Sequence, residues 1–139
     1  MSDKSTQYDL EDRTFIFAKR VREFVRNLPR SFLNTDDCRQ LIRSSGSVGA
    51  NYIEANNSLS RKDFRMRIMI CRKEAKESGY WLRLINPIGE SLDTDRNFLL
   101  DESRQLMNIF GAMLRNTQEG SRPAGARGKS EIRKSKSEN

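Results

Sequence analysis

The segment from Arg61 to Ile85 constrains the fold most, because it predicts one long helix with apolar residues on two opposite sides. At about 100° of turn per residue, two separate stripes lie roughly 180° apart. The first consists of Phe64, Ile68, Cys71, Ala75, Ser78, Leu82 and Ile85, and the second of Met66, Met69, Ile70, Tyr80 and Leu84. A helix at the edge of a small bundle needs only one such stripe. The second stripe therefore predicts that a partner chain, or another copy of this chain, covers the other side.

Three further segments have helical periodicity, and there is almost no alternation of the kind that indicates strands. They run from about Leu10 to Leu28, Asp36 to Asn56, and Asp95 to Asn116. Candidate N-caps are Ser60 for the Arg61–Ile85 helix, with Asp63 completing a capping box, and Thr35, Asp36 or Asp37 for the Asp36–Asn56 helix.

The stretch from Ser44 to Ala50 is rich in serine and glycine, which have low helix propensity. A loop is one interpretation. The three-four periodicity continues through it, which favours a helix whose small side chains let a neighbouring backbone approach closely.

Four amphipathic helices with short connections predict an all-α fold, an antiparallel up-down-up-down four-helix bundle that is oligomeric. We expect the bundle to span residues 9–117, after a flexible N-terminus at 1–8. Residues 118–139 contain six basic and three acidic residues and few apolar ones, which predicts a disordered basic tail.

Composition favours a soluble, cytoplasmic protein. Charged residues make up 32% of the chain, the mean hydropathy is -0.80, and no apolar run approaches the roughly 20 residues of a membrane span. We therefore expect no membrane contact. Cys38 and Cys71 are isolated on apolar helix positions, which predicts buried free thiols, with a disulfide between them as the alternative. The net charge of +7 favours polyanionic partners.

Nothing in the chain indicates catalysis. It contains no histidine, the commonest general base and a frequent metal ligand. Glu74 and Glu77 suggest a carboxylate metal site, but helical phase puts both away from the core stripe, and Glu77 is a simple partner for Lys73. We expect no enzymatic activity, no cofactor, no metal and no small-molecule substrate.

Several sequence blocks resemble a known family. They are Leu41 to Ala55, Lys62-Asp63-Phe64, and Lys73 to Leu82. Over about residues 8–117 the chain is similar to the bacterial four-helix-bundle family encoded within intervening sequences of 23S ribosomal RNA genes. The resemblance implies a ring-like homopentamer. It also implies kinship with the accessory proteins of diversity-generating retroelements, which are basic and work with a reverse transcriptase and nucleic acid. It supplies no catalytic residues.

A basic stripe lies between the two apolar stripes of the Arg61–Ile85 helix. Its members are Arg65, Arg72, Lys76 and Arg83, which fall within about 40° of one another. They are our candidate nucleic-acid-binding residues, since repeated cations concentrate positive potential that can hold a phosphate backbone. The alternative is that acidic residues of a neighbouring helix or subunit neutralise them.

A candidate oligomer interface combines two helices. It contains Arg43, Ser47 and Glu54 on the back face of the Asp36–Asn56 helix, with Met66, Met69, Ile70, Tyr80, Trp81 and Leu84 on the Arg61–Ile85 helix. Arg43 and Glu54 could form a polar pair across that contact. Trp81 is more typical of an interface anchor than of a base-stacking platform.

Together these features predict a homo-oligomeric adaptor that binds nucleic acid, RNA or DNA and preferentially RNA, by electrostatics without base-specific contacts. The alternative is a protein-interaction scaffold whose charge only maintains solubility.

Overall fold

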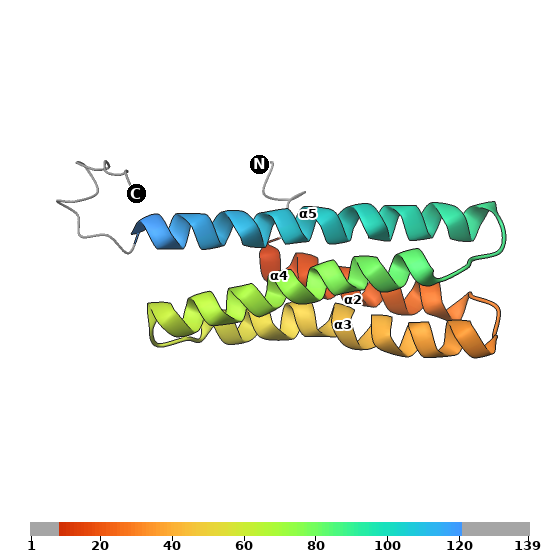
Figure 1. Cartoon of the computed structure of the whole chain (residues 1–139), viewed down its shortest axis with the longest axis horizontal. Helices are drawn as coiled ribbons and strands as arrows, with labels where there is room; N and C mark the ends of the chain where they lie inside the picture. The colour runs from red at the N-terminus through yellow and green to blue at the C-terminus, as the bar shows by residue number, and fades with distance from the viewer. Residues whose placement is uncertain (1–8, 121–139) are drawn as a thin grey trace.

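The computed structural model describes residues 9–120 and consists there of four helices and no strand (Figure 1). They are α2 (Leu10–Arg26), α3 (Phe32–Asn56), α4 (Arg61–Leu84) and α5 (Glu90–Gly120). The all-α prediction with four helices is confirmed, and the helices lie alongside one another as in a bundle. The predictions for residues 1–8 and for 121–139 lie outside the described residues, and α5 continues to Gly120, past the predicted boundary at residue 117.

Serine hydroxyls begin two of the helices. Ser60 Oγ accepts a hydrogen bond from the backbone N–H of Asp63 at 3.0 Å, which confirms it as the N-cap of α4. In α3 the corresponding group is Ser31 Oγ, which accepts from Asn34 N at 3.1 Å. The predicted caps Thr35, Asp36 and Asp37 are wrong, because the helix begins one turn earlier and includes all three.

The fourth helix also begins earlier than predicted, at Glu90 rather than at about Asp95. Gly89 precedes it with a φ of 102°, a left-handed conformation that glycine adopts without steric cost. The Gly89 carbonyl then accepts from Asp93 N at 3.0 Å. This is the first i→i+4 hydrogen bond of the helix, so the connector ends at Gly89, and α5 begins five residues before the predicted boundary.

The core is apolar and receives side chains from all four helices. The predicted first stripe of α4 is buried from Ile68 to Ile85, whereas Phe64 is half-buried at its edge. The largest fully buried side chains of the other helices are Phe17, Val21, Leu41, Val48, Leu99, Leu106 and Phe110.

Small residues bring α4 close to its two neighbours, α3 and α5. The stretch from Ser44 to Ala50 is helical, which confirms the helix interpretation over the loop. Ser44 and Ser78 lie 2.9 Å apart, Oγ to Oγ, in the contact between α3 and α4. On the other side, a Cβ on Gly79 would lie only 3.0 Å from Ser103 Oγ of α5. Both contacts require small side chains.

Candidate nucleic-acid interface

The basic stripe of α4 divides into two parts in the structure. Arg65 Nη1 donates a hydrogen bond to the carbonyl oxygen of Leu114 at 2.6 Å and is partly buried, so its guanidinium connects α4 to α5. Arg72, Lys76 and Arg83 are exposed. These three cations remain available at the surface along about three turns of helix.

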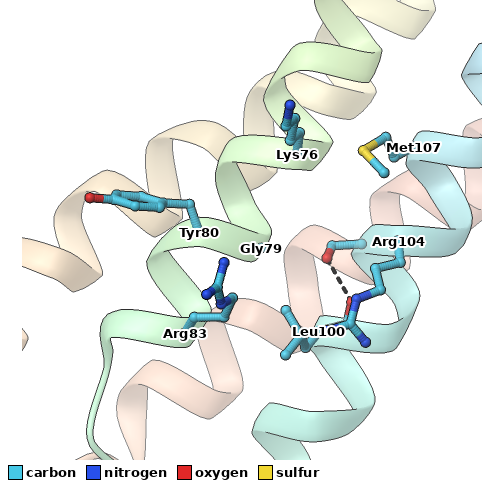
Figure 2. A pocket seen from close by; sticks show the side chains of 8 residues that line it. Lys76, Gly79, Tyr80, Arg83, Leu100, Arg104 and Met107 are labelled. Atoms are coloured by element: carbon cyan, nitrogen blue, oxygen red, sulfur yellow. Dashed lines mark hydrogen bonds between the residues drawn. The ribbon is translucent and has the colours of Figure 1, made fainter.

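A groove between α4 and α5 holds two of these cations and adds a third. Figure 2 shows Lys76 and Arg83 projecting from α4, with Gly79 between them, and Arg104 on the facing side of α5. The groove has a volume of about 410 Å³, and its other lining residues are Tyr80, Leu100, Ser103 and Met107. No carboxylate lines it. Positive charge therefore surrounds a hollow whose remaining surface is neutral.

Arg115 extends the basic surface along α5. A Cβ on Gly111 would lie 3.6 Å from Arg115 Nη1 and 3.7 Å from Arg72 Nε, so both guanidinium groups lie over the Gly111 backbone. We call Arg72, Lys76, Arg83, Arg104 and Arg115 the basic groove.

No cation of the basic groove forms an ion pair within residues 9–117. Other basic residues do have acidic partners: Arg13 binds Glu102 at 2.7 Å, and Arg39 binds Asp36 at 2.9 Å. Among the described residues of this single chain, no acidic side chain of a neighbouring helix pairs with these cations, and the other part of that alternative, neutralisation by a second subunit, stays a prediction. The like-charge pair formed by Arg72 and Lys76 at i, i+4 is unfavourable until an anion binds beside it.

Sequence reasoning missed Arg104 and Arg115, because it considered the basic stripe of one helix alone. A signal was present: these two residues are eleven positions apart, as are Arg72 and Arg83, and eleven residues complete about three turns. Equal spacing on two helices allows the two rows to face one another. Which helix lies opposite α4 depends on the tertiary packing.

The predicted second apolar stripe of α4 is largely exposed. Met66 is 48% exposed, Met69 55%, Tyr80 53% and Leu84 44%, while Ile70 is half-buried. We call these five residues the α4 apolar face. They form two exposed apolar groups on the single chain, one at each end of α4, with Lys73 and Glu77 on the same side of the helix between them.

The remaining candidate interface residues lie beside this face with different local contacts. Arg43 Nη2 donates to Glu74 Oε1 and Glu77 Oε1, each at 3.3 Å, within the same chain. Ser47 Oγ accepts from Asn51 Nδ2 at 2.9 Å. Glu54 is exposed.

Trp81 is half-buried, packs against the core and contacts the Tyr80 ring edge-on at 5.0 Å between centroids. It therefore supports the position of Tyr80 on the α4 apolar face.

The predicted position of Glu74 away from the core is wrong. Glu74 is only 5% exposed, because α3 packs over that side of α4 and Arg43 covers the carboxylate. Lys73 Nζ lies 3.9 Å from the second carboxylate oxygen. Among the residues described, no three histidine, cysteine or acidic side chains are grouped as metal ligands would be.

The two cysteines are free and buried, as predicted. Burial raises the pKa of the Cys71 thiol to about 12, although the nearby charge of Arg67 acts in the opposite direction. Burial, followed by the negative charge of Asp37, also raises the pKa of Cys38. Neither thiol has the lowered pKa of a reactive cysteine.

None of the described helices combines the length and the apolar character required to cross a bilayer.

Comparison with known proteins identifies relatives by sequence and by fold. A comparison with functionally curated proteins found no match. The fold is similar to a crystal structure of a protein with unknown function from the S23 ribosomal protein family of Bacteroides thetaiotaomicron. The TM-score is 0.64 at 28% identity, over 75% of this chain and 96% of that one.

The family model described as 23S rRNA-intervening sequence protein matches residues 7–112, which include all of α2, α3 and α4 and most of α5. The chain therefore belongs to the family of 23S rRNA-intervening sequence proteins.

Proposed function

We propose that the protein is a non-enzymatic, homo-oligomeric adaptor of the cytoplasm that binds RNA through electrostatic contacts with its basic groove. The observation that carries the proposal is the row of cations between α4 and α5, none of which is paired with a described carboxylate. Phosphate groups would replace the missing counter-charges.

The energetics of polyanion binding support this choice. Each phosphate neutralised by lysine or arginine releases condensed counterions, and this release makes binding favourable without any contact to base edges. Lys76, Arg83 and Arg104 surround one hollow, where their potentials add. The overall charge of +7 acts in the same direction at longer range.

We further infer that the four helices alternate in direction, up-down-up-down, and that several copies associate. Asn34 Nδ2 at the start of α3 donates to the carbonyl oxygen of Asn86, just beyond the end of α4, at 3.4 Å, which supports opposite directions for α3 and α4. The exposed α4 apolar face supports self-association. The family resemblance makes a pentameric ring our specific proposal.

The test measures RNA binding as a function of salt. Fluorescence anisotropy of labelled RNA should show affinity that falls steeply between 50 and 200 mM salt, by roughly tenfold or more, as expected for several phosphate contacts. Arg72→Glu combined with Lys76→Glu should weaken binding by at least about tenfold at low salt, because two contacts become repulsive. Lys19→Glu combined with Arg30→Glu changes the net charge equally, at exposed positions outside the groove.

Equal losses in the two double variants would show that only net charge matters. Failure of the wild-type protein to bind RNA at low salt would reject the proposal.

The alternative function is a protein-interaction scaffold, and the α4 apolar face favours it, because an exposed surface of this kind also fits a partner protein. RNA binding distinguishes the two functions. A scaffold would fail to retain RNA at low salt and would lose its partner when Tyr80 or Leu84 is replaced by a charged residue.

A further inference from the structure

We propose that the basic groove takes a single strand of RNA, lying lengthwise between α4 and α5, and that it excludes duplex RNA. This inference rests on the proposed function and specifies its ligand. The observation behind it is that the unpaired cations form two facing rows rather than one patch.

The two rows have the same spacing. Arg72 and Arg83 on α4, and Arg104 and Arg115 on α5, are each eleven residues apart, or about 16 Å at about 1.5 Å per residue. Arg83 and Arg104 line the same hollow, and Arg72 and Arg115 lie together over the Gly111 backbone. Each end of the groove thus has one arginine from each helix. Lys76 lies between the two ends, since it comes between Arg72 and Arg83 along α4.

The floor of the groove is neutral. Gly79 and Ser103 meet at its centre, where the two helices approach so closely that a Cβ on Gly79 would lie 3.0 Å from Ser103 Oγ. Leu100 and Met107 supply apolar surface along the α5 side. Phosphates would contact the cations on both walls, and the sugar and base could pack against this floor.

The dimensions favour one strand. Axes of packed helices lie about 8–10 Å apart, so the groove between them admits one backbone and not the two paired strands of an A-form RNA duplex. A duplex is convex and would reach only one wall at a time. A single strand is flexible enough to enter and contact both walls.

The length of the groove sets the number of nucleotides. At about 3.4 Å per phosphate of a stacked strand, 16 Å accommodates about five phosphates. This number is within the range of about 4–16 nucleotides known for other single-strand-binding surfaces. With all five cations engaged, the slope of log affinity against log salt should approach about −3.5.

The experiment compares labelled oligouridylates of 3, 5, 8 and 12 nucleotides with a blunt RNA duplex of 12 base pairs, using fluorescence anisotropy on the full-length protein. We expect affinity to increase steeply up to about five nucleotides and only slightly beyond, and the 8-mer to bind at least tenfold more tightly than the duplex. Arg83→Glu with Arg104→Glu should weaken binding of the 8-mer at least tenfold. Lys19→Glu with Arg30→Glu is the control of equal charge, and circular dichroism checks that both variants remain helical.

The possible failures are distinguishable. Equal or tighter binding of the duplex would overturn the inference and leave the proposed function intact. If the double variant Arg83→Glu with Arg104→Glu binds the 8-mer as tightly as the wild-type protein does, the basic groove is not the binding site and the inference is likewise overturned. No binding of either RNA at low salt would reject the proposed function together with this inference.

Discussion

The hydroxyl oxygens of Ser44 in α3 and Ser78 in α4 lie 2.9 Å apart in a fully buried contact. Ser78 Oγ also lies 2.9 Å from the carbonyl oxygen of Glu74, and Ser44 Oγ lies 3.3 Å from that of Leu41; because each hydroxyl has one proton, two of these three hydrogen bonds form at a time. Each hydroxyl thus has a partner in its own helix, and the two helices approach closely because both side chains are small. The contact therefore depends on side-chain volume more than on the hydrogen bond between the serines.

The first prediction separates volume from hydrogen bonding at Ser78. Ser78→Leu should destabilise the protein by about 1–3 kcal/mol, because the larger side chain pushes α3 and α4 apart. Ser78→Ala should cost less than about 1 kcal/mol, since Ser44 retains its bond to Leu41. Urea unfolding followed by circular dichroism measures both. Ser91→Leu, at an exposed position, is the control, and an equal cost for the alanine and leucine variants would contradict the argument.

Hydrophobic periodicity correctly predicted the helices and the helix faces that are buried because they are apolar. The stripe from Ile68 to Ile85 is buried as expected, because residues three and four apart share one face of a helix whatever packs against it. The same argument predicted the helix through Ser44 to Ala50 despite its low propensity, which the packing of α4 against it overrides.

The errors concern features that depend on a second helix or on backbone geometry. Glu74 is polar, and its burial follows from Arg43 of α3, which lies 31 residues away along the chain. Arg104 and Arg115 belong to the basic groove only because α5 packs beside α4. The beginning of α5 depends on the left-handed backbone conformation of Gly89. Helical phase within one segment contains none of this information.

The second prediction tests the corrected beginning of α3. Ser31→Ala should destabilise the protein by about 1 kcal/mol, because Asn34 N loses its hydrogen-bond acceptor at the helix terminus. Thr35→Ala should change the stability by less than about 0.5 kcal/mol, since Thr35 is exposed within the helix. Chemical denaturation compares the two. A larger effect at Thr35 than at Ser31 would place the cap where the sequence alone suggested.

The third prediction concerns Arg43, which covers the buried carboxylate of Glu74. Arg43→Ala should destabilise by about 1–3 kcal/mol, because the carboxylate is left with only Lys73 near it. Glu74→Gln should reduce this effect when both changes are combined, since the neutral amide does not need the guanidinium. A double-mutant cycle measures the coupling. Additive effects of the two substitutions would show that the pair contributes nothing to stability.

The fourth prediction follows from the pKa of Cys71, which burial raises from 9.0 to about 12. Between these pH values the thiol ionises in the unfolded chain but stays protonated in the folded one, so the unfolded state binds fewer protons. Stability should therefore fall as pH rises above about 9, by up to about 1.4 kcal/mol per pH unit from this group.

The comparison with Cys71→Ala isolates this contribution, because lysines and tyrosines titrate over the same range in both proteins. The wild-type protein should lose more stability than the variant between pH 8 and 10.5, measured by urea unfolding at each pH. Parallel pH profiles for the two proteins would contradict a buried, protonated thiol. Below pH 8 the difference between the two stabilities should be constant.

The fifth prediction tests whether the α4 apolar face forms a contact between copies of the chain. Met66 and Leu84 lie eighteen residues apart, or five full turns, and so share one line along the helix. Met66→Glu combined with Leu84→Glu should convert the proposed assembly into a monomer of 16.1 kDa, because the charges would be buried without partners in a contact between copies. Both side chains are exposed in the single chain, so helicity should not change.

Light scattering at micromolar concentration measures the mass. Leu59→Glu combined with Ile88→Glu is the matched control, since these apolar side chains are also exposed but lie outside α4. The control variant should keep the mass of the wild-type protein, because it also loses two exposed apolar side chains but none from the α4 apolar face. A wild-type mass of 16.1 kDa would mean that solvent, and not another copy, covers the α4 apolar face.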